Sequence, residues 1–238
     1  MKFQSIILAA GPATADNPDF KKSRFRVDSK ETLLELSLDV YKSSDKIVVA
    51  VNPDDYKFFI SKKLVESPCL LNVTHPTQGS LPTSGMCLDL IANDMPILIS
   101  AIDGLCFDII EDFLFEMQRT KADGGVIVFP SKKLNYSYVR VSQSVPIEFA
   151  EKIRIGELAT SGIYFFRDKH LLIESIQWAI LNQISYKTNY YLSAAMNRLI
   201  FENRKVVLFK TAEENYYRFS SEGEAMESVN RMRVKNIG

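Results

Sequence analysis

The chain has 238 residues, of which 46% are hydrophobic and 24% charged, so it can bury the core of an ordinary globular protein. Its 29 Lys and Arg residues balance its 29 Asp and Glu residues, which argues against a dedicated binder of nucleic acid or of a membrane surface. No apolar run approaches the ~20 residues of a membrane-spanning helix, and the N-terminus lacks a signal-peptide pattern. We therefore expect a cytoplasmic protein with no nucleic-acid or membrane partner.

The first half of the chain alternates apolar, β-branched runs with helical patterns. Strands are predicted within residues 3–11 and at 47–51, 69–73, 96–101 and 125–129, and helices at 31–41, 56–65, 83–92 and 107–118. This alternation predicts a mostly parallel sheet with helices on both faces. Ligands are then expected beyond the carboxyl ends of the strands.

After residue 130 the pattern changes. Strands are predicted at residues 136–141, 159–166 and 206–209, and helices at 171–184 and 190–201. Residues 220–238 are charged and too weakly patterned for a prediction. Because no internal repeat or low-complexity linker separates the two halves, we expect a single domain, residues 1–238, in two lobes.

Cysteine and histidine usage offers no metal site. Cys69, Cys87 and Cys106 lie in or beside apolar runs without metal-ligand spacing, and they are expected to be buried thiols in a reducing compartment. His75 and His170 lie far apart in the sequence and are expected at the surface.

The loop after the first strand is a candidate phosphate site. Gly11 ends the apolar run, and a glycine there lets backbone N–H groups point at a phosphate without a side chain in the way. The basic residues Lys21, Lys22, Arg24 and Arg26 follow, and their charges oppose those of a triphosphate. The alternative is an ordinary turn followed by a solvated basic loop.

Two further loops follow predicted strands. Gln78, Gly79 and Thr83 offer an amide, an open backbone and a hydroxyl that suit a base edge and a ribose, although a loop with a helix N-cap explains them equally. Asp103 follows a buried strand, where a carboxylate can hold Mg²⁺ together with substrate phosphates. The alternative for Asp103 is a turn residue, because Asp-Gly is a common turn dipeptide.

The last candidate residues lie in the second lobe. Lys152 can bind a second phosphate and Glu151 can accept hydrogen bonds from sugar hydroxyls, whereas an exposed ion pair is the plain alternative. Tyr190 and Tyr191 follow Asn189 at the start of a predicted helix, where they can line a sugar pocket or pack in the core or at the rim.

Taken together, these segments resemble the nucleoside-diphosphate-sugar pyrophosphorylases, or sugar-phosphate nucleotidylyltransferases, over residues 6 to about 228. The matching segments are IILAAG at residues 6–11, the segment from Lys22 to Glu35, Gln78-Gly79 with Thr83, the strand ending at Asp103, Glu151-Lys152 with the segment around Gly162, and Asn189-Tyr190-Tyr191. Their shared order along the chain is more specific than any single match.

The resemblance implies a three-layer αβα nucleotide-diphospho-sugar transferase fold, which is GT-A-like and Rossmann-like, with a mixed, mostly parallel sheet. It implies joining of a nucleoside triphosphate to a sugar phosphate or a similar phosphorylated small molecule, with release of pyrophosphate, for surface polysaccharide precursors. Residues 1–130 would bind the nucleotide and residues 131–238 the acceptor, with Mg²⁺ as cofactor. A homo-oligomer is left open.

The resemblance also implies roles for single residues. Lys22, Asp103 and Lys152 would be catalytic, with Asp103 holding the metal. Leu8, Ala9, Ala10, Gly11, Gln78, Gly79 and Thr83 would bind the nucleotide. Glu151, Gly162, Asn189 and Tyr190 would bind the acceptor.

The sequence departs from the family pattern at two places. Gly11 is followed by Pro12-Ala13-Thr14-Ala15, which lacks the family's second glycine and its arginine, and Lys21 stands where the family has proline. The stretch from Tyr217 to Glu224 lacks the family's late aspartate, for which Glu222 or Glu224 would have to substitute. These departures keep a second hypothesis open, a catalytically inactive nucleotide-sugar-binding or regulatory protein. A glycosyltransferase ranks lowest, because the chain has no Asp-x-Asp motif.

Overall fold

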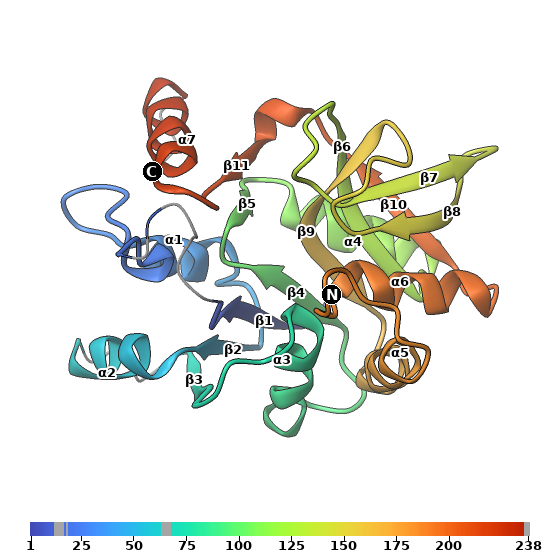
Figure 1. Ribbon diagram of the computed structural model, residues 1–238, viewed down its shortest axis with the longest axis horizontal. Helices are drawn as coiled ribbons and strands as arrows, with labels where there is room; N and C mark the ends of the chain where they lie inside the picture. The colour runs from blue at the N-terminus through green and yellow to red at the C-terminus, as the bar shows by residue number, and fades with distance from the viewer. Residues whose placement is uncertain (12–16, 18, 63–67, 236–238) are drawn as a thin grey trace.

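The computed structural model describes residues 1–11, 17, 19–62 and 68–235. The strands of the main sheet are β1 (Gln4–Ala9), β2 (Lys46–Val51), β3 (Cys69–Asn72), β4 (Ile97–Ala101), β6 (Gly124–Pro130), β7 (Tyr138–Ser142), β8 (Val145–Ala150), β9 (Leu158–Phe166) and β10 (Val206–Lys210). Within the described residues, they are ordered β10-β6-β9-β4-β1-β2-β3, and the β7–β8 hairpin joins through β9 (Figure 1). A separate antiparallel pair consists of β5 (Gly104–Cys106) and β11 (Tyr216–Arg218).

Helices cover both faces of the sheet. They are α1 (Leu33–Val40), α2 (Pro53–Ser61), α3 (Ser80–Met86), α4 (Ile110–Thr120), α5 (Lys169–Leu181), α6 (Leu192–Phe201) and α7 (Glu222–Val234), with short 3-10 turns η1 (Lys22–Arg24), η2 (Leu88–Leu90) and η3 (Glu213–Asn215). Alternate strand residues serve opposite cores: Ile7 and Val49 pack in the core of α1, α2, α4 and α7, whereas Ile6 and Val48 pack in that of α3, α5 and α6. The expected three-layer arrangement is confirmed.

Strand direction places the carboxyl ends of four strands along one edge of the sheet. β1 runs parallel to β2 and β4, and β2 runs parallel to β3. β9 is antiparallel to both β4 and β6, so its first residues reach the same edge. The sheet is therefore mixed, and the segments that follow β1 to β4 meet the start of β9.

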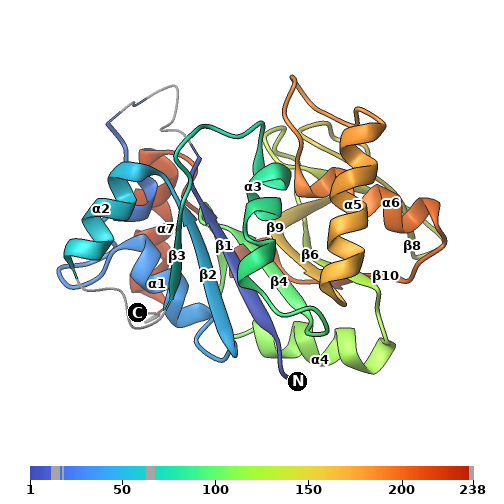
Figure 2. The ribbon, with the colours of Figure 1, turned by 90° about the horizontal axis from the view of Figure 1, so that it is seen from below.

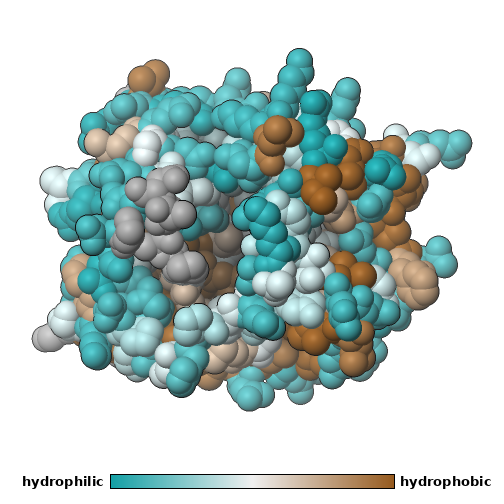
Figure 3. Space-filling view, in the orientation of Figure 1, coloured by the Kyte–Doolittle hydropathy of each residue, from teal (hydrophilic) through white to brown (hydrophobic). Residues whose placement is uncertain are grey.

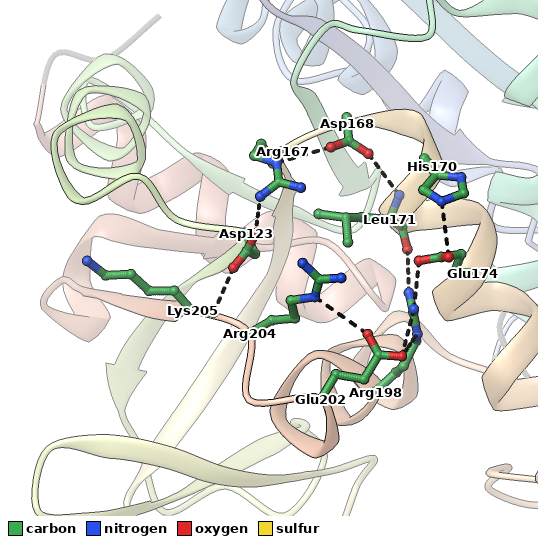
Figure 4. Close-up of polar contacts among 10 residues, drawn as sticks. All are labelled: Asp123, Arg167, Asp168, His170, Leu171, Glu174, Arg198, Glu202, Arg204 and Lys205. Carbon is green, nitrogen blue, oxygen red and sulfur yellow. Dashed lines mark hydrogen bonds and ion pairs between the residues drawn. The ribbon is translucent and has the colours of Figure 1, made fainter.

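A charged network ties α5 to α6 on one face of the sheet, away from this edge (Figure 4). Arg198, whose side chain is buried, places Nη2 2.6 Å from Glu174 Oε2 and 2.7 Å from Glu202 Oε1. His170 lies at the helix surface, as predicted, with Nε2 3.1 Å from Glu174 Oε1. In Figure 2, α5 and α6 lie side by side. A buried arginine with two carboxylate partners is a satisfied structural group.

Several predicted elements need correction. The helix expected at 83–92 is two pieces, α3 and η2, and the one at 107–118 begins only at Ile110. α2 begins earlier than predicted, at Pro53, because the Asn52 side chain accepts a hydrogen bond from the Asp55 N–H and caps it. Residues 63–65 of that predicted helix lie outside the described residues.

Other expectations concern the cysteines and membrane spans. Cys87 and Cys106 are buried free thiols as predicted, whereas Cys69 is only half-buried. Burial raises the pKa of the Cys87 thiol to about 12. Within the described ranges, no helix combines the length and apolar character that crossing a membrane requires.

Candidate functional site

A cavity of about 900 Å³ opens at the edge where the carboxyl ends of the strands meet. Its lining includes the ends of β1, β2 and β4, the loop after β3, the start of β9 and β11, so both halves of the chain contribute. The charged residues in the lining are Lys21, Lys22, Asp54, Asp55, Asp103, Glu151, Lys152 and Arg218. Figure 3 shows the face of the molecule that is hollowed at this place. The cavity thus offers cations, which suit phosphate groups, and carboxylates, which can accept hydrogen bonds from hydroxyls.

The end of β1 forms one wall of the cavity. Leu8, Ala9, Ala10 and Gly11 all line it. The Leu8 carbonyl accepts a hydrogen bond from the Ile102 N–H at 3.1 Å, which holds this wall against the end of β4. A Cβ added at Gly11 would have no atom of the described residues within 4 Å, its two chain neighbours left aside. The departures at Pro12, Ala13, Thr14 and Ala15 lie outside the described residues.

Lys22 and Asp103 meet in this cavity, although 80 positions of sequence separate them. Lys22, in η1, places its Nζ 3.6 Å from Asp103 Oδ2. The Ser220 hydroxyl donates a hydrogen bond to the same oxygen at 3.2 Å. Both charged side chains are partly buried, with 22% and 34% exposed, so the pair is screened less than a surface ion pair would be.

A buried carboxylate anchors the turn that carries Lys22. Asp55, in the first turn of α2, accepts hydrogen bonds from the Ser23 hydroxyl, from Arg24 Nε at 2.5 Å and from Asn52 Nδ2 at 3.0 Å. The two residues that follow Lys22 are therefore both fixed to the end of β2. This anchor was not anticipated from the sequence.

The β3–α3 loop forms another wall. Gly79 and Thr83 line the cavity, and the Thr83 hydroxyl donates to the Gly79 carbonyl at 2.9 Å. Gln78 and Tyr190, both expected in the site, do not line the cavity. The Tyr190 N–H donates to the Gln78 carbonyl at 2.7 Å, and the Leu81 N–H donates to the Tyr190 carbonyl at 3.1 Å. Their backbones join the two segments that make this wall.

The second lobe supplies Glu151, Lys152, Gly162 and Asn189, all of which line the cavity. The Glu151 carboxylate accepts hydrogen bonds from Ser137 Oγ and, at 2.9 Å, from Ser193 Oγ. Burial raises the pKa of Glu151 above its ordinary value, against these hydrogen bonds, which lower it. The charged end of Lys152 lies 5.4 Å from the centroid of the Tyr191 ring. Of these two neighbouring tyrosines, Tyr191 rather than Tyr190 lines the cavity.

Arg218 is a cavity residue that sequence reasoning did not select. It ends β11 and pairs in register with Gly104, the residue after Asp103. For the stretch from Tyr217 to Glu224, the sequence led only to the expectation of a substitute carboxylate. Glu222 and Glu224, the two suggested substitutes, do not line the cavity: Glu224 Oε2 lies 3.1 Å from Arg218 Nε, and Glu222 accepts from the Asn17 side chain at 2.8 Å. The one feature of the sequence that could have pointed to this place is the presence of an arginine in the stretch from Tyr217 to Glu224.

No family model and no curated protein matches the sequence. The fold, however, is shared with solved structures. The nucleoside-diphosphate-sugar pyrophosphorylase from Vibrio cholerae RC9 superposes with a TM-score of 0.80 and 18% identity, over 94% of this chain and 99% of that one. A UDP-glucose pyrophosphorylase complexed with UDP-glucose gives a TM-score of 0.77 and 15% identity, over 99% of this chain and 100% of the other. The α/β fold expected from the sequence is thus confirmed, and this chain shares it with these solved pyrophosphorylase structures.

Proposed function

We propose that this chain is a magnesium-dependent nucleotidyltransferase. A sugar phosphate, or a similar phosphorylated small molecule, would attack the α-phosphate of a nucleoside triphosphate, and pyrophosphate would leave. The observation that carries the proposal is the meeting of Lys22 and Asp103 in a large cavity at the carboxyl ends of β1 and β4. Transfer of this kind needs positioning and neutralisation of charge more than a protein nucleophile. The product would suit the synthesis of surface polysaccharide precursors.

The first lobe supplies the groups for the nucleotide. The open backbone from Leu8 to Gly11 would lie along the nucleotide, and Gly79 with Thr83 would face the base and the ribose. The Lys22 ammonium would stabilise the charge that develops around the α-phosphate. The anchor at Asp55 supports this role, because a cation already held in place costs less reorganisation free energy in the transition state than a mobile one.

Asp103 fits a magnesium ion that is bound together with substrate. Its Oδ2 contacts Lys22 and Ser220, while Oδ1 has no partner among the described residues. The described part of the chain holds no group of three or more His, Cys, Asp or Glu that could hold a metal. Mg²⁺ needs only one or two carboxylates when waters and substrate phosphates complete its shell. When bound, the ion would neutralise phosphate charge.

The second lobe supplies the groups for the acceptor. The Lys152 ammonium would hold the acceptor phosphate, and the Glu151 carboxyl would accept hydrogen bonds from its hydroxyls. Gly162 and Asn189 line the same part of the cavity and would contact the acceptor.

The test is release of pyrophosphate with Mg²⁺, using several nucleoside triphosphates in combination with several sugar 1-phosphates. We expect release only when both substrates are present. Asp103→Ala should lower the rate by about a hundred- to a thousandfold in a protein that still unfolds cooperatively. Asp89→Ala, an exposed aspartate outside the cavity, is the matched control and should retain the rate. Full activity in Asp103→Ala would remove the proposed role, and ligand-induced stabilisation without turnover would identify the inactive binding protein instead.

A further inference from the structure

Arg218 is a largely buried cation in the wall of the cavity. Its side chain is 16% exposed, and its Cζ lies 4.4 Å from the centroid of the Tyr136 ring. Nε donates to Ser220 Oγ at 2.9 Å and lies 3.1 Å from Glu224 Oε2 in an ion pair, and Nη2 donates to the Asn135 carbonyl at 3.3 Å. Nη1 is buried and has no hydrogen-bond partner in the described part of the chain. Buried donors are nearly always paired, so this one needs an explanation.

The position of Arg218 is fixed relative to Asp103. The Phe219 N–H donates to the Asp103 carbonyl at 2.9 Å, and the Ser220 hydroxyl links Arg218 Nε to Asp103 Oδ2. Lys22 approaches the same carboxylate oxygen. One carboxylate therefore lies between two cations, an ammonium from the first lobe and a guanidinium from β11. A ligand phosphate entering here would compete with the carboxylates of Asp103 and Glu224 for these two cations.

We propose that Arg218 binds a phosphate group of the ligand in this cavity. This inference rests on the proposed function, since the phosphate would belong to one of its two substrates. A guanidinium matches phosphate geometry better than an ammonium does, and it is weakly hydrated, so it suits a partly buried site. The Tyr136 ring holds the guanidinium plane. Nη1 is covered in this structure, so a phosphate oxygen would give it an acceptor only after the atoms that cover it move aside.

Two sources of the phosphate are distinguished by two probes. Inorganic pyrophosphate represents the leaving part of the nucleoside triphosphate, and a sugar 1-phosphate represents the acceptor. Each is titrated calorimetrically into the wild type and into Arg218→Gln, without metal and with a chelator present, so that a cation cannot mask the side chain. We expect affinity for at least one probe to fall by about tenfold or more, because a charge-assisted hydrogen bond is lost. The probe that loses affinity identifies the phosphate.

Arg231 offers a matched control. Its Cζ lies 4.7 Å from the centroid of the Tyr217 ring and its Nη2 donates to the Glu214 carbonyl at 2.7 Å. Arg231 therefore makes the same two kinds of contact as Arg218, one with a tyrosine ring and one with a backbone carbonyl, but it does not line the cavity. Arg231→Gln should bind both probes as the wild type does. If Arg218→Gln fails to fold, Arg218→Lys is the second variant, because lysine retains the charge without the planar donors of a guanidinium. Its affinity for the phosphate probe should lie below that of the wild type.

The outcomes separate this inference from the proposed function. Unchanged affinities in the folded Arg218 variants, equal losses in Arg231→Gln, or a wild type that binds neither probe would each overturn it. Phosphate binding that depends on Arg218 in a protein without turnover would leave the inference standing while the proposed function fails. If the protein turns over both substrates and Arg218→Gln leaves the KM for each unchanged, the proposed function stands and this inference fails.

Discussion

The Nε of Arg24 lies 2.5 Å from Oδ1 of Asp55, so an ion pair joins the turn that carries Lys22 to the first turn of α2. Asp55 is only 2% exposed, and the Arg24 guanidinium also covers the Phe58 ring, 4.6 Å from its centroid. The carboxylate accepts further hydrogen bonds from Ser23 and Asn52. The basic turn is thus tied to the scaffold at the residues directly after Lys22.

Asp55→Ala should destabilise the protein and reduce turnover together. Removing the carboxylate leaves Arg24 and Ser23 without their acceptor, so we expect a loss of about 2–4 kcal/mol in the free energy of unfolding, measured by urea denaturation. Asp54→Asn, at the exposed neighbouring position, is the stability control and should stay within about 0.5 kcal/mol of the wild type. An Asp55→Ala protein as stable as the wild type would show that the anchor contributes nothing.

The close approach of Gly79 to Tyr190 makes a second prediction. Gly79 has a φ of +103°, and a Cβ there would lie 2.3 Å from the Tyr190 carbonyl oxygen. Gly79→Ala should therefore cost about 1–3 kcal/mol of stability and weaken nucleotide binding, because the wall has to open. Gly85→Ala, in α3, is the control: its Cβ would meet only Ile176 Cδ1, at 3.7 Å. Thermal unfolding of both variants checks this, and equal melting temperatures would contradict it.

The sheet could be predicted from the sequence because its strands are buried on both faces. A strand such as β2, with Ile47 to Val51 all buried, must be apolar at consecutive positions, and this pattern is visible without a partner strand. β5 and β11 could not be found, since three-residue strands have no periodicity and their pairing joins distant segments. α7 was missed because its exposed residues are charged and it buries only a narrow stripe around Val229.

The candidate site was only partly predictable for a related reason. Residue type can suggest chemistry, and Lys22 and Asp103 do lie together in the cavity. Residue type does not show which residues face the cavity. Gln78 and Tyr190 join two loops through their backbones, while Tyr191 lines the cavity. Arg218 was overlooked because its place beside Asp103 depends on the β5–β11 register, which no local pattern specifies.

Magnesium should bind only in the presence of nucleotide. Asp103 offers one unpaired carboxylate oxygen, and Lys22 and Arg218 add positive charge beside it, which opposes a cation bound alone. Mg²⁺ by itself should leave the melting temperature unchanged, whereas Mg²⁺ with a nucleoside triphosphate should raise it by more than the nucleotide with a chelator does. A rise with Mg²⁺ alone, equal to that of the full mixture, would instead indicate a preformed metal site.

The carboxyl of Glu151 should make stability depend on pH in an unusual direction. Burial raises its folded pKa above the ordinary glutamate value of 4.5, so the folded state holds the proton more tightly than the unfolded state does. Its stabilising contribution is then complete below the unfolded pKa and is lost as pH rises through the folded pKa. Glu151→Gln keeps the hydrogen-bond acceptor for Ser137 and Ser193 without the charge.

We therefore expect the stability of the wild type relative to Glu151→Gln to fall over a range of pH that begins near the ordinary glutamate pKa of 4.5. Urea unfolding of both proteins across this range measures the difference, and Glu157→Gln, at an exposed position, controls for the loss of one carboxylate. A relative stability of the wild type that rises with pH would mean that the Ser137 and Ser193 hydroxyls outweigh burial and hold Glu151 ionised in the fold.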